Sequence, residues 1–333
     1  FSQRRAGLRQ AQEMAKAAYN RKVNIASELS KFIDALVSSG RIQGGAVHWA
    51  KYFSELWDEM DERAQDPQDI WGIPTGFTDF DKVTGGLQPG ELMLLSGIPG
   101  VGKSMFAMQM AEQMAAHAPG AIYSLEMGGK QVARRIVSAA AKVTTRKLKT
   151  GRVEEDEWPV IVQAIERLSK LPVYMSDATG WTTTSLRADI ARLKAAYGLQ
   201  WFVFDYLLLA NDALQQDETE RTAIISRGMK LLCRHLDVAG VSIHSMNKAG
   251  MDGTPAQKNL RGSGQVSYDA DLIVFLTEFQ VMDQFDDASI PLDDRANLRT
   301  LIFGKGRELE NPKKYLHMVK RPHYPMFGDY TGL

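Results

Sequence analysis

The octapeptide GIPGVGKS at residues 97–104 has the residue types and the spacing of a phosphate-binding loop. It follows the apolar stretch ELMLLS and precedes the helix-like KSMFAMQMAEQMA, the setting that the pattern G-x-x-x-x-G-K-[S/T] requires. Glycines let backbone N–H groups surround phosphate oxygens at the amino end of a helix, whose dipole favours an anion. The pattern therefore predicts nucleotide binding rather than a glycine turn with only a structural role. The residues expected to contact the nucleotide are Gly97, Pro99, Gly100, Val101, Gly102, Lys103, Ser104 and Met105.

Two acidic residues at the ends of apolar stretches could complete a hydrolytic site. Asp205 ends WFVFD, and we expect it to hold a magnesium ion together with the hydroxyl of Ser104. Glu126 lies in YSLEM, after the segment that follows the loop, and could orient or deprotonate an attacking water. The alternative for each carboxylate is exposure to solvent at a strand end. With the phosphate-binding loop and Lys103, these residues predict hydrolysis of a nucleoside triphosphate.

Two cations follow an apolar run in LIFGKGRELE, about two hundred residues beyond the loop. Lys305 and Arg307 would point the same way from a strand end, because residues i and i+2 lie on one face of a strand. They could neutralise charge on a transferring phosphoryl group. Residues 299–321 are strongly basic, so a basic surface or a DNA-binding face is the competing explanation.

The elements around these residues alternate between short apolar stretches and amphipathic segments. The stretches that we expect to be strands are ELMLLSG, GAIYSLE, LPVYMSD, WFVFDYLLL, GVSIHS and DLIVFL. Amphipathic segments, including 183–197 and 218–238, lie between them, and the alternation predicts an α/β fold with a mostly parallel sheet and helices on both faces.

The sequence divides into three predicted segments. Helical periodicity extends over residues 1–63, a linker over 64–72, and the α/β domain over 73–333. One apolar stripe ends before Gly40 and a second includes Trp49, Phe53 and Trp57. Because no core is visible within these sixty residues, we expect the stripes to pack on a further N-terminal domain or on another subunit.

The composition, 44% hydrophobic and 24% charged residues, suits a globular protein. The formal net charge is zero, so contact with nucleic acid must depend on a local basic patch. The single cysteine, Cys233, excludes an intramolecular disulfide framework and a Cys-rich zinc module, and indicates a reducing compartment. No apolar run has the length of a membrane span, so we expect no membrane contact. Because the sequence begins with Phe1, we expect it to start inside a longer chain.

Four stretches together resemble the ATPase domain of the DnaB-type replicative helicases, including phage versions. They are GIPTGFTDFDKVTGGLQPGELMLLSGIPGVGKS, YSLEMGGKQVARRIVS, TTSLRADIARLKAAYGLQWFVFDYLLL and LRGSGQVSYDADLIVFL. The resemblance runs from about residue 71 to 330, and the helical region 5–64 loosely resembles the end of the family's N-terminal domain and its linker helix. It implies a RecA-like fold, a homohexameric ring around one DNA strand, and 5′ to 3′ translocation driven by ATP and Mg2+. It also implies a helicase loader and a primase as partners, and the cytoplasm of a bacterium or phage-infected host.

The resemblance also suggests roles for residues outside the phosphate-binding loop. The K-x-R strand end of the family serves the nucleotide of the adjacent subunit, and Lys305 and Arg307 match it. The Gly-rich segment 247–264 corresponds to the family's DNA-binding loop. The residues expected to contact the phosphate backbone of single-stranded DNA are Lys248, Lys258, Arg261, Gly262 and Gly264.

One position departs from the family pattern. Ser245, in SIHSMNK, stands where the family usually has a glutamine that senses the terminal phosphate. Serine is too short to span the same gap, so His244 or Asn247 could substitute, or the coupling between hydrolysis and DNA binding could be weaker. A histidine that faces the core is the alternative for His244.

Two other classes of function stay open at this point. A RecA-like ATPase of the recombination or clock type shares the phosphate-binding loop and the acidic residues, but less of LRGSGQVSYDADLIVFL. A ring without catalytic activity, acting as a scaffold, is the second alternative. Without zinc-binding cysteines, a fused primase module is not expected in this stretch.

Overall fold

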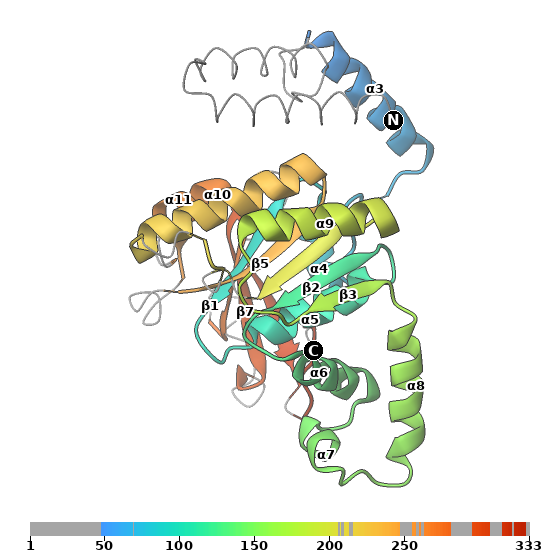
Figure 1. Cartoon of the computed structure of the whole chain (residues 1–333). Coiled ribbons are helices and arrows are strands. Elements are labelled where there is room, and N and C mark those ends of the chain that lie inside the picture. Colours follow the sequence, from blue (N-terminus) through green and yellow to red (C-terminus); the bar gives the residue numbers. More distant parts are fainter. Residues whose placement is uncertain are drawn as a thin grey trace, which may run out of the picture. The chain divides into compact units, whose positions relative to one another are not determined.

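The computed structural model describes residues 48–68, 70–205, 207, 210–212, 216–246, 255–257, 260, 263–280, 295–306, 315–321 and 323–330 (Figure 1). The chain divides into two compact units, Phe1–Pro67 and Gln68–Leu333. The division falls inside the predicted linker 64–72. Within the described residues, the first unit contains one helix, α3 (Ala50–Gln65).

Helix α3 is amphipathic, and none of its residues is buried. Its large apolar side chains, Trp49 at its N-cap included, are all at least half exposed; they are Trp49, Tyr52, Phe53, Leu56, Trp57 and Met60. Ion pairs between residues four apart, Lys51 with Glu55 and Arg63 with Glu59, stabilise the helix itself. The first predicted stripe, which ends before Gly40, lies outside the described residues.

The second unit is built on a sheet whose described strands have the order β3-β2-β4-β5-β1-β6-β7-β8-β9. The strands β1 to β6 are parallel and correspond to the six predicted stretches. Their bounds are Leu92–Gly97, Gly120–Ser124, Val173–Ser176, Trp201–Asp205, Ala239–Ser245 and Leu272–Glu278. Three strands continue the sheet in antiparallel fashion: β7 (Leu298–Gly306), β8 (Tyr315–Lys320) and β9 (Phe327–Asp329). The α/β class and the mostly parallel sheet are therefore confirmed, and the antiparallel edge is an addition.

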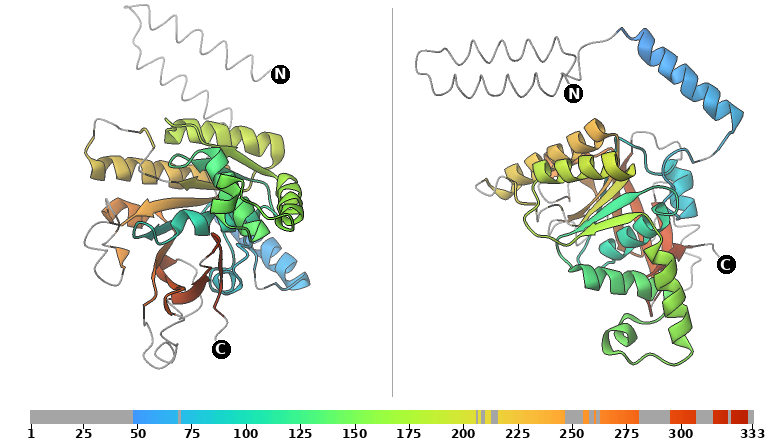
Figure 2. Two further views of the ribbon diagram at one scale, coloured as in Figure 1. Left: turned by 90° about the horizontal axis from the view of Figure 1, so that it is seen from below. Right: turned by 45° about the vertical axis from the view of Figure 1, so that its right-hand side comes forward.

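Helices cover both faces of this sheet (Figure 1). Within the described residues of this unit they are α4 (Thr78–Thr84), α5 (Lys103–Met114), α6 (Gly129–Ala141), α7 (Thr145–Thr150), α8 (Glu157–Ser169), α9 (Thr183–Tyr197), α10 (Glu218–Leu236) and α11 (Ser263–Asp269). One apolar core lies between the sheet and α4, α5 and α6. The other lies between the sheet and α9, α10 and α11, of which α9 and α10 lie side by side (Figure 2). Within the described residues, the helices are too short or too polar to cross a membrane.

Local sequence explains where the helices of the second core begin and end. Helix α9 starts at a capping box in which the Thr182 hydroxyl accepts a hydrogen bond from the backbone N–H of Ser185, and the Ser185 hydroxyl accepts one from the backbone N–H of Thr182. It ends at Gly198, whose φ of +71° is the left-handed conformation that favours glycine. Helix α10 starts where the Asp217 carboxylate accepts from the N–H of Glu220.

The central strand β1 is buried along its whole length, as expected for a parallel strand covered on both faces. Farther along the sheet, the indole of the fully buried Trp201 on β4 lies across Gly120 on β2. A Cβ atom on Gly120 would lie 2.0 Å from that indole, which itself donates a hydrogen bond to the Ala118 carbonyl at 2.8 Å. The strand spacing here therefore requires glycine.

We expect Gly120→Ala to lower the free energy of unfolding by about 1–3 kcal/mol, because the new methyl group overpacks the Trp201 indole. The matched control is Gly328→Ala in β9, where a Cβ would meet no atom within 4 Å. Chemical denaturation followed by tryptophan fluorescence compares the two variants. Equal stability of both would show that the indole can move aside.

Candidate nucleotide site at the carboxyl edge of the sheet

The phosphate-binding loop connects the carboxyl end of β1 to the amino end of α5, as the sequence predicted. Gly100 and Gly102 have φ values of +79° and +115°, which side chains other than glycine rarely adopt. A Cβ at Gly102 would also lie 2.9 Å from the Phe327 ring, so the loop can turn here only with glycine. Val101 is buried and belongs to the core under α4 and α5, so its side chain supports the loop from below.

The ammonium group of Lys103 lies folded over the loop that carries it. It donates hydrogen bonds to the carbonyls of Gly97 and Ile98, each at 2.9 Å. Burial lowers the pKa of Lys103, while the negative charges of Asp205 and Glu126 oppose this shift. The cation is thus held close to where the phosphates would lie, on contacts that a phosphate can replace.

Asp205 is the last residue of β4 and is almost completely buried. Neither of its carboxylate oxygens has a hydrogen-bond partner of normal geometry within the described part of the chain. Burial, and to a smaller extent Glu126, raises the pKa of Asp205. The nearby Ser104 hydroxyl, Lys103 and Arg135 act in the opposite direction. A buried carboxylate with free oxygens beside a hydroxyl is the ligand chemistry that fits Mg2+.

Magnesium would depend on substrate phosphates and water for its remaining ligands. Among the described residues, no group of three or more His, Cys, Asp or Glu side chains could hold a metal by itself. Mg2+ commonly binds to one or two protein oxygens together with nucleotide phosphates and water. Ser104 and Asp205 therefore fit the ion as it occurs in phosphoryl-transfer sites.

The loop, Asp205 and Glu126 line one cavity of about 690 Å³. Its lining residues are Pro99, Gly100, Gly102, Lys103, Ser104, Met105, Glu126, Met127, Gln131, Arg135, Thr145, Asp205, Ile243, Ser245, Lys320 and Pro325. Glu126 lies just beyond β2 and is exposed, so it can reach a water near the terminal phosphate. The volume is within the usual range for sites that bind small molecules.

Sequence reasoning missed two cations of this cavity, Arg135 on α6 and Lys320 at the end of β8. Gln131 and Arg135 are one helical turn apart, so one face of α6 presents both to the cavity. This i, i+4 spacing in GKQVARR was a readable signal. No comparable signal in the sequence marked Lys320, because only the antiparallel strands bring this residue to the cavity. Burial lowers the pKa of Lys320, Arg299 adds to the shift, and Glu278 opposes it.

The structure separates the proposed sensor residues at the end of β5. Ser245 lines the cavity, as does Ile243. His244 is fully buried and points to the opposite face of the strand, away from the cavity. The structure therefore brings Ser245, and not His244, to the cavity. Asn247 lies outside the described residues.

The structure describes only some of the residues predicted to bind DNA or to form the K-x-R strand end. Lys248, Lys258, Arg261, Gly262 and Arg307 lie outside the described residues. Gly264 is exposed on α11, where a Cβ would meet no atom within 4 Å. Lys305, near the end of β7, donates to backbone carbonyls of its own chain at Ser267, Tyr268 and Ala270.

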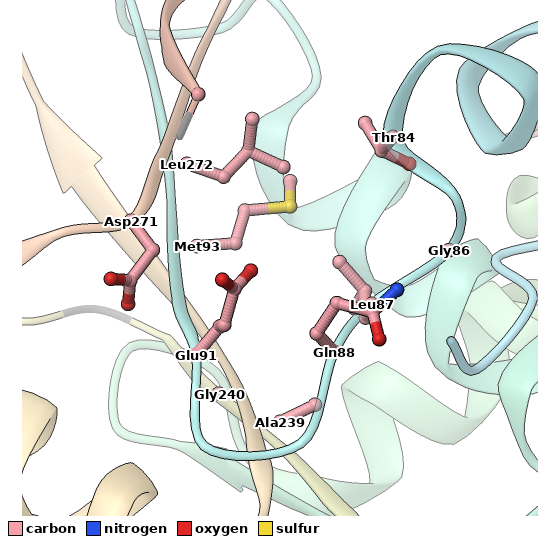
Figure 3. A pocket seen from close by; sticks show the side chains of 11 residues that line it. Thr84, Gly86, Leu87, Gln88, Glu91, Met93, Ala239, Gly240, Asp271 and Leu272 are labelled. Carbon is pink, nitrogen blue, oxygen red and sulfur yellow. The ribbon is translucent and has the colours of Figure 1, made fainter. Parts of the chain in front are cut away.

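A second cavity lies at the opposite, amino-terminal edge of the parallel strands. Figure 3 shows Glu91, Met93 and Leu272 around it. Its volume is about 30 Å³, enough for one or two water molecules. The Asp271 carboxylate on its wall accepts hydrogen bonds from the Leu92 N–H at 2.9 Å and the Lys230 ammonium at 2.6 Å. This cavity is therefore too small and too well satisfied to compete as the nucleotide site.

Comparison with known proteins identifies relatives of the second unit. The family described as "DnaB-like helicase C terminal domain" matches residues 72–323. The replicative DNA helicase DnaC of Bacillus subtilis is 33% identical over 67% of this chain and 50% of its own length. The replicative DNA helicase DnaB of Haemophilus influenzae is 34% identical over 72% and 51%, and that of Leifsonia xyli subsp. xyli is 30% identical over 83% and 60%.

These relatives are longer proteins, and the chain spans about half to three fifths of their length. Among solved structures, the ATPase domain of G40P superposes with a TM-score of 0.76 and 24% identity, over 86% of this chain and 100% of that one. A DnaB-like replicative helicase whose structure was described together with its interactions with primase gives a TM-score of 0.72, over 98% and 77%. At this level of identity the likeness shows the fold, which is that of a RecA-like ATPase domain.

We expect Arg135→Ala to weaken nucleotide binding by about tenfold or more, because a charged hydrogen-bond donor is removed from the phosphate cavity. The matched control is Arg134→Ala on the same helix, since Arg134 does not line the cavity. Titration with a fluorescent ATP analogue in the presence of Mg2+ measures both variants. Equal loss in both would mean that the effect comes from α6 as a whole.

Proposed function

Because this chain belongs to the DnaB-like helicase C-terminal domain family, we propose that it is the motor of a replicative DNA helicase. It hydrolyses ATP with Mg2+, moves 5′ to 3′ along single-stranded DNA and unwinds duplex at a replication fork. One observation carries the proposal: a chain of this family brings Lys103, Ser104, Asp205 and Glu126 to one cavity.

Each of these side chains has a separate role in ATP hydrolysis. Lys103 exchanges the carbonyls of Gly97 and Ile98 for phosphate oxygens when ATP enters. Ser104 and Asp205 would hold Mg2+, which would neutralise phosphate charge when bound. Glu126 accepts a proton from the water that attacks the terminal phosphate. Arg135 adds a further positive charge from the same subunit.

Assembly of identical subunits into a hexameric ring completes this site in the proposal. Arg307 of one subunit would reach the phosphates bound by the next. The exposed apolar face of α3 supports association, because an isolated amphipathic helix in water needs a partner for that face. A primase and a helicase loader are the proposed external partners, and the cytoplasm of a bacterium or of a phage-infected host is the proposed location.

The segment 247–264 is the proposed contact to single-stranded DNA. In the sequence it follows β5, which ends at Ser245, and its last two residues belong to α11. Lys248, Lys258 and Arg261, with the N–H groups near Gly262 and Gly264, would bind phosphates without reading bases. The contrasting function is a RecA-like ATPase of the recombination or clock type, which hydrolyses ATP without processive unwinding.

Unwinding of a forked duplex tests the proposal directly. The wild-type chain should displace a strand only with ATP and Mg2+ and only when the fork has a 5′ single-stranded tail. Glu126→Gln should still bind ATP but hydrolyse it about a hundredfold more slowly, because the general base is removed. The matched control, Glu166→Gln, changes an exposed carboxylate on α8 that pairs with Lys170, and it should keep full activity. ATP turnover without strand displacement would favour the recombination or clock class.

The role of Arg307 is tested by mixing subunits. Arg307→Ala should leave ATP binding and ring assembly intact, yet reduce hydrolysis by about 10³-fold, because the charge from the neighbour is missing. Added to Glu126→Gln subunits, it should regain activity at interfaces where an intact base meets an intact arginine. A chain with both substitutions, mixed with Arg307→Ala, is the control that should stay inactive. If Arg307→Ala and Glu126→Gln subunits form mixed rings but recover no ATP hydrolysis, Arg307 does not act on the nucleotide of a neighbouring subunit.

A further inference from the structure

The short strand β9, at one edge of the described sheet, is held from outside the sheet by a single side chain. On one side β9 pairs with β8, where Lys320 lies opposite Phe327. From α5, the helix that follows the phosphate-binding loop, the Gln109 amide forms two hydrogen bonds with the backbone of Phe327. It accepts from the Phe327 N–H at 2.7 Å and donates to the Phe327 carbonyl at 2.8 Å. The side-chain amide thus makes the contacts that a further strand would make at this edge.

This pairing keeps the Phe327 ring against the phosphate-binding loop. The ring is fully buried and lies edge-on to Phe106 of α5, with 5.6 Å between the ring centroids. A Cβ atom on Gly102 would be 2.9 Å from the ring, so the ring lies directly against the loop where φ is +115°. Because a glycine has access to many backbone conformations, packing from Phe327 restricts Gly102 to this one.

Two residues on the β8 side of this contact line the nucleotide cavity. They are Lys320, the register partner of Phe327, and Pro325, two residues before Phe327. Gln109 itself does not line that cavity. It can therefore affect a bound nucleotide only through what it holds, which is the ring against Gly102 and the cavity wall that Lys320 and Pro325 form.

A separate contact holds the far end of β9. The Asp329 carboxylate accepts a hydrogen bond at 2.9 Å from the N–H of Thr78, the first residue of α4. This contact and the pairing with β8 do not involve Gln109. We therefore expect β9 to loosen at Phe327, rather than to detach, when Gln109 is replaced.

We propose that Gln109 is a positioning residue for nucleotide binding, because it keeps β9 on α5 and thereby preforms the phosphate-binding loop and one wall of the cavity. The inference rests on the proposed function for the nucleotide, while the contacts themselves join described residues. These contacts raise the fraction of nucleotide-free molecules whose loop is ready for phosphate. Since apparent affinity scales with that fraction, their loss should raise KM for ATP and leave kcat unchanged.

The test compares Gln109→Met, Phe327→Leu and the wild-type chain. Gln109→Met keeps the length of the side chain but removes both hydrogen bonds, and Phe327→Leu keeps the backbone that pairs with Gln109 but removes the ring. Titration with a fluorescent ATP analogue in the presence of Mg2+, together with steady-state ATP hydrolysis, gives the affinity, KM and kcat. Gln109→Met should weaken binding and raise KM about tenfold, the effect of two ordinary hydrogen bonds, with kcat within about twofold of wild type. Phe327→Leu should raise KM about tenfold as well.

Hydrogen exchange gives a readout that does not depend on the nucleotide. Amides of residues 327–329 should exchange faster in Gln109→Met than in wild type, and so should those of residues 100–104 without nucleotide. The matched control is Glu112→Met on the same helix, because Glu112 pairs with Arg167 of α8 at 2.6 Å and does not line the cavity. It should change neither the affinity nor the exchange at 327–329. If Gln109→Met does not fold, Phe327→Leu tests the same support through the ring.

Three results would overturn the inference. Faster exchange at 327–329 with wild-type affinity would show that β9 supports no part of the nucleotide site. A lower kcat at unchanged KM would show a general loss of folded chain instead of positioning. An equal loss of affinity in Glu112→Met would trace the effect to α5 in general. A wild-type chain that binds no ATP analogue would overturn the proposed function, whereas a wild-type chain that binds it no better than Gln109→Met would overturn the positioning role alone.

Discussion

The parallel alignment of β1 with β5, and of β4 with β2, is the constraint on which the site depends. Gly97 at the end of β1 is in register with Ser245 at the end of β5, and Asp205 on β4 is in register with Ser124 on β2. Because these strands are buried and point the same way, the residues that follow them meet at one edge. Three features that are far apart in the sequence are therefore close in space: the phosphate-binding loop, the Asp205 carboxylate and the end of β5.

The charges at this edge suit a nucleotide bound together with Mg2+. A buried carboxylate without hydrogen-bond partners is unfavourable unless a cation approaches it, and Asp205 is in that position within the described chain. Lys103 is nearby but directs its hydrogen bonds to loop carbonyls. Binding of phosphate with Mg2+ would satisfy both groups together.

The antiparallel strands connect this edge to a second group of contacts. Lys320 and Pro325, on β8 and beyond it, reach the nucleotide cavity, while Phe327 on β9 reaches Gln109 and Gly102. Strands β8 and β9 belong to a single hydrogen-bonded extension of the sheet beyond β6. One wall of the cavity and the phosphate-binding loop thus share one support.

The sequence by itself determined the features that depend on neighbouring residues: the phosphate-binding loop, the parallel strands, and Asp205 and Glu126 at their ends. These could be predicted because strand ends of a parallel sheet meet whatever the details of packing. Only the tertiary structure decided that Lys320 joins the cavity, that His244 faces away from it, and that Lys305 turns to α11. The reason is physical: strand order beyond β6 and one extra residue at Gly304 set which face a side chain takes, and a single-residue shift reverses that face without changing the local pattern.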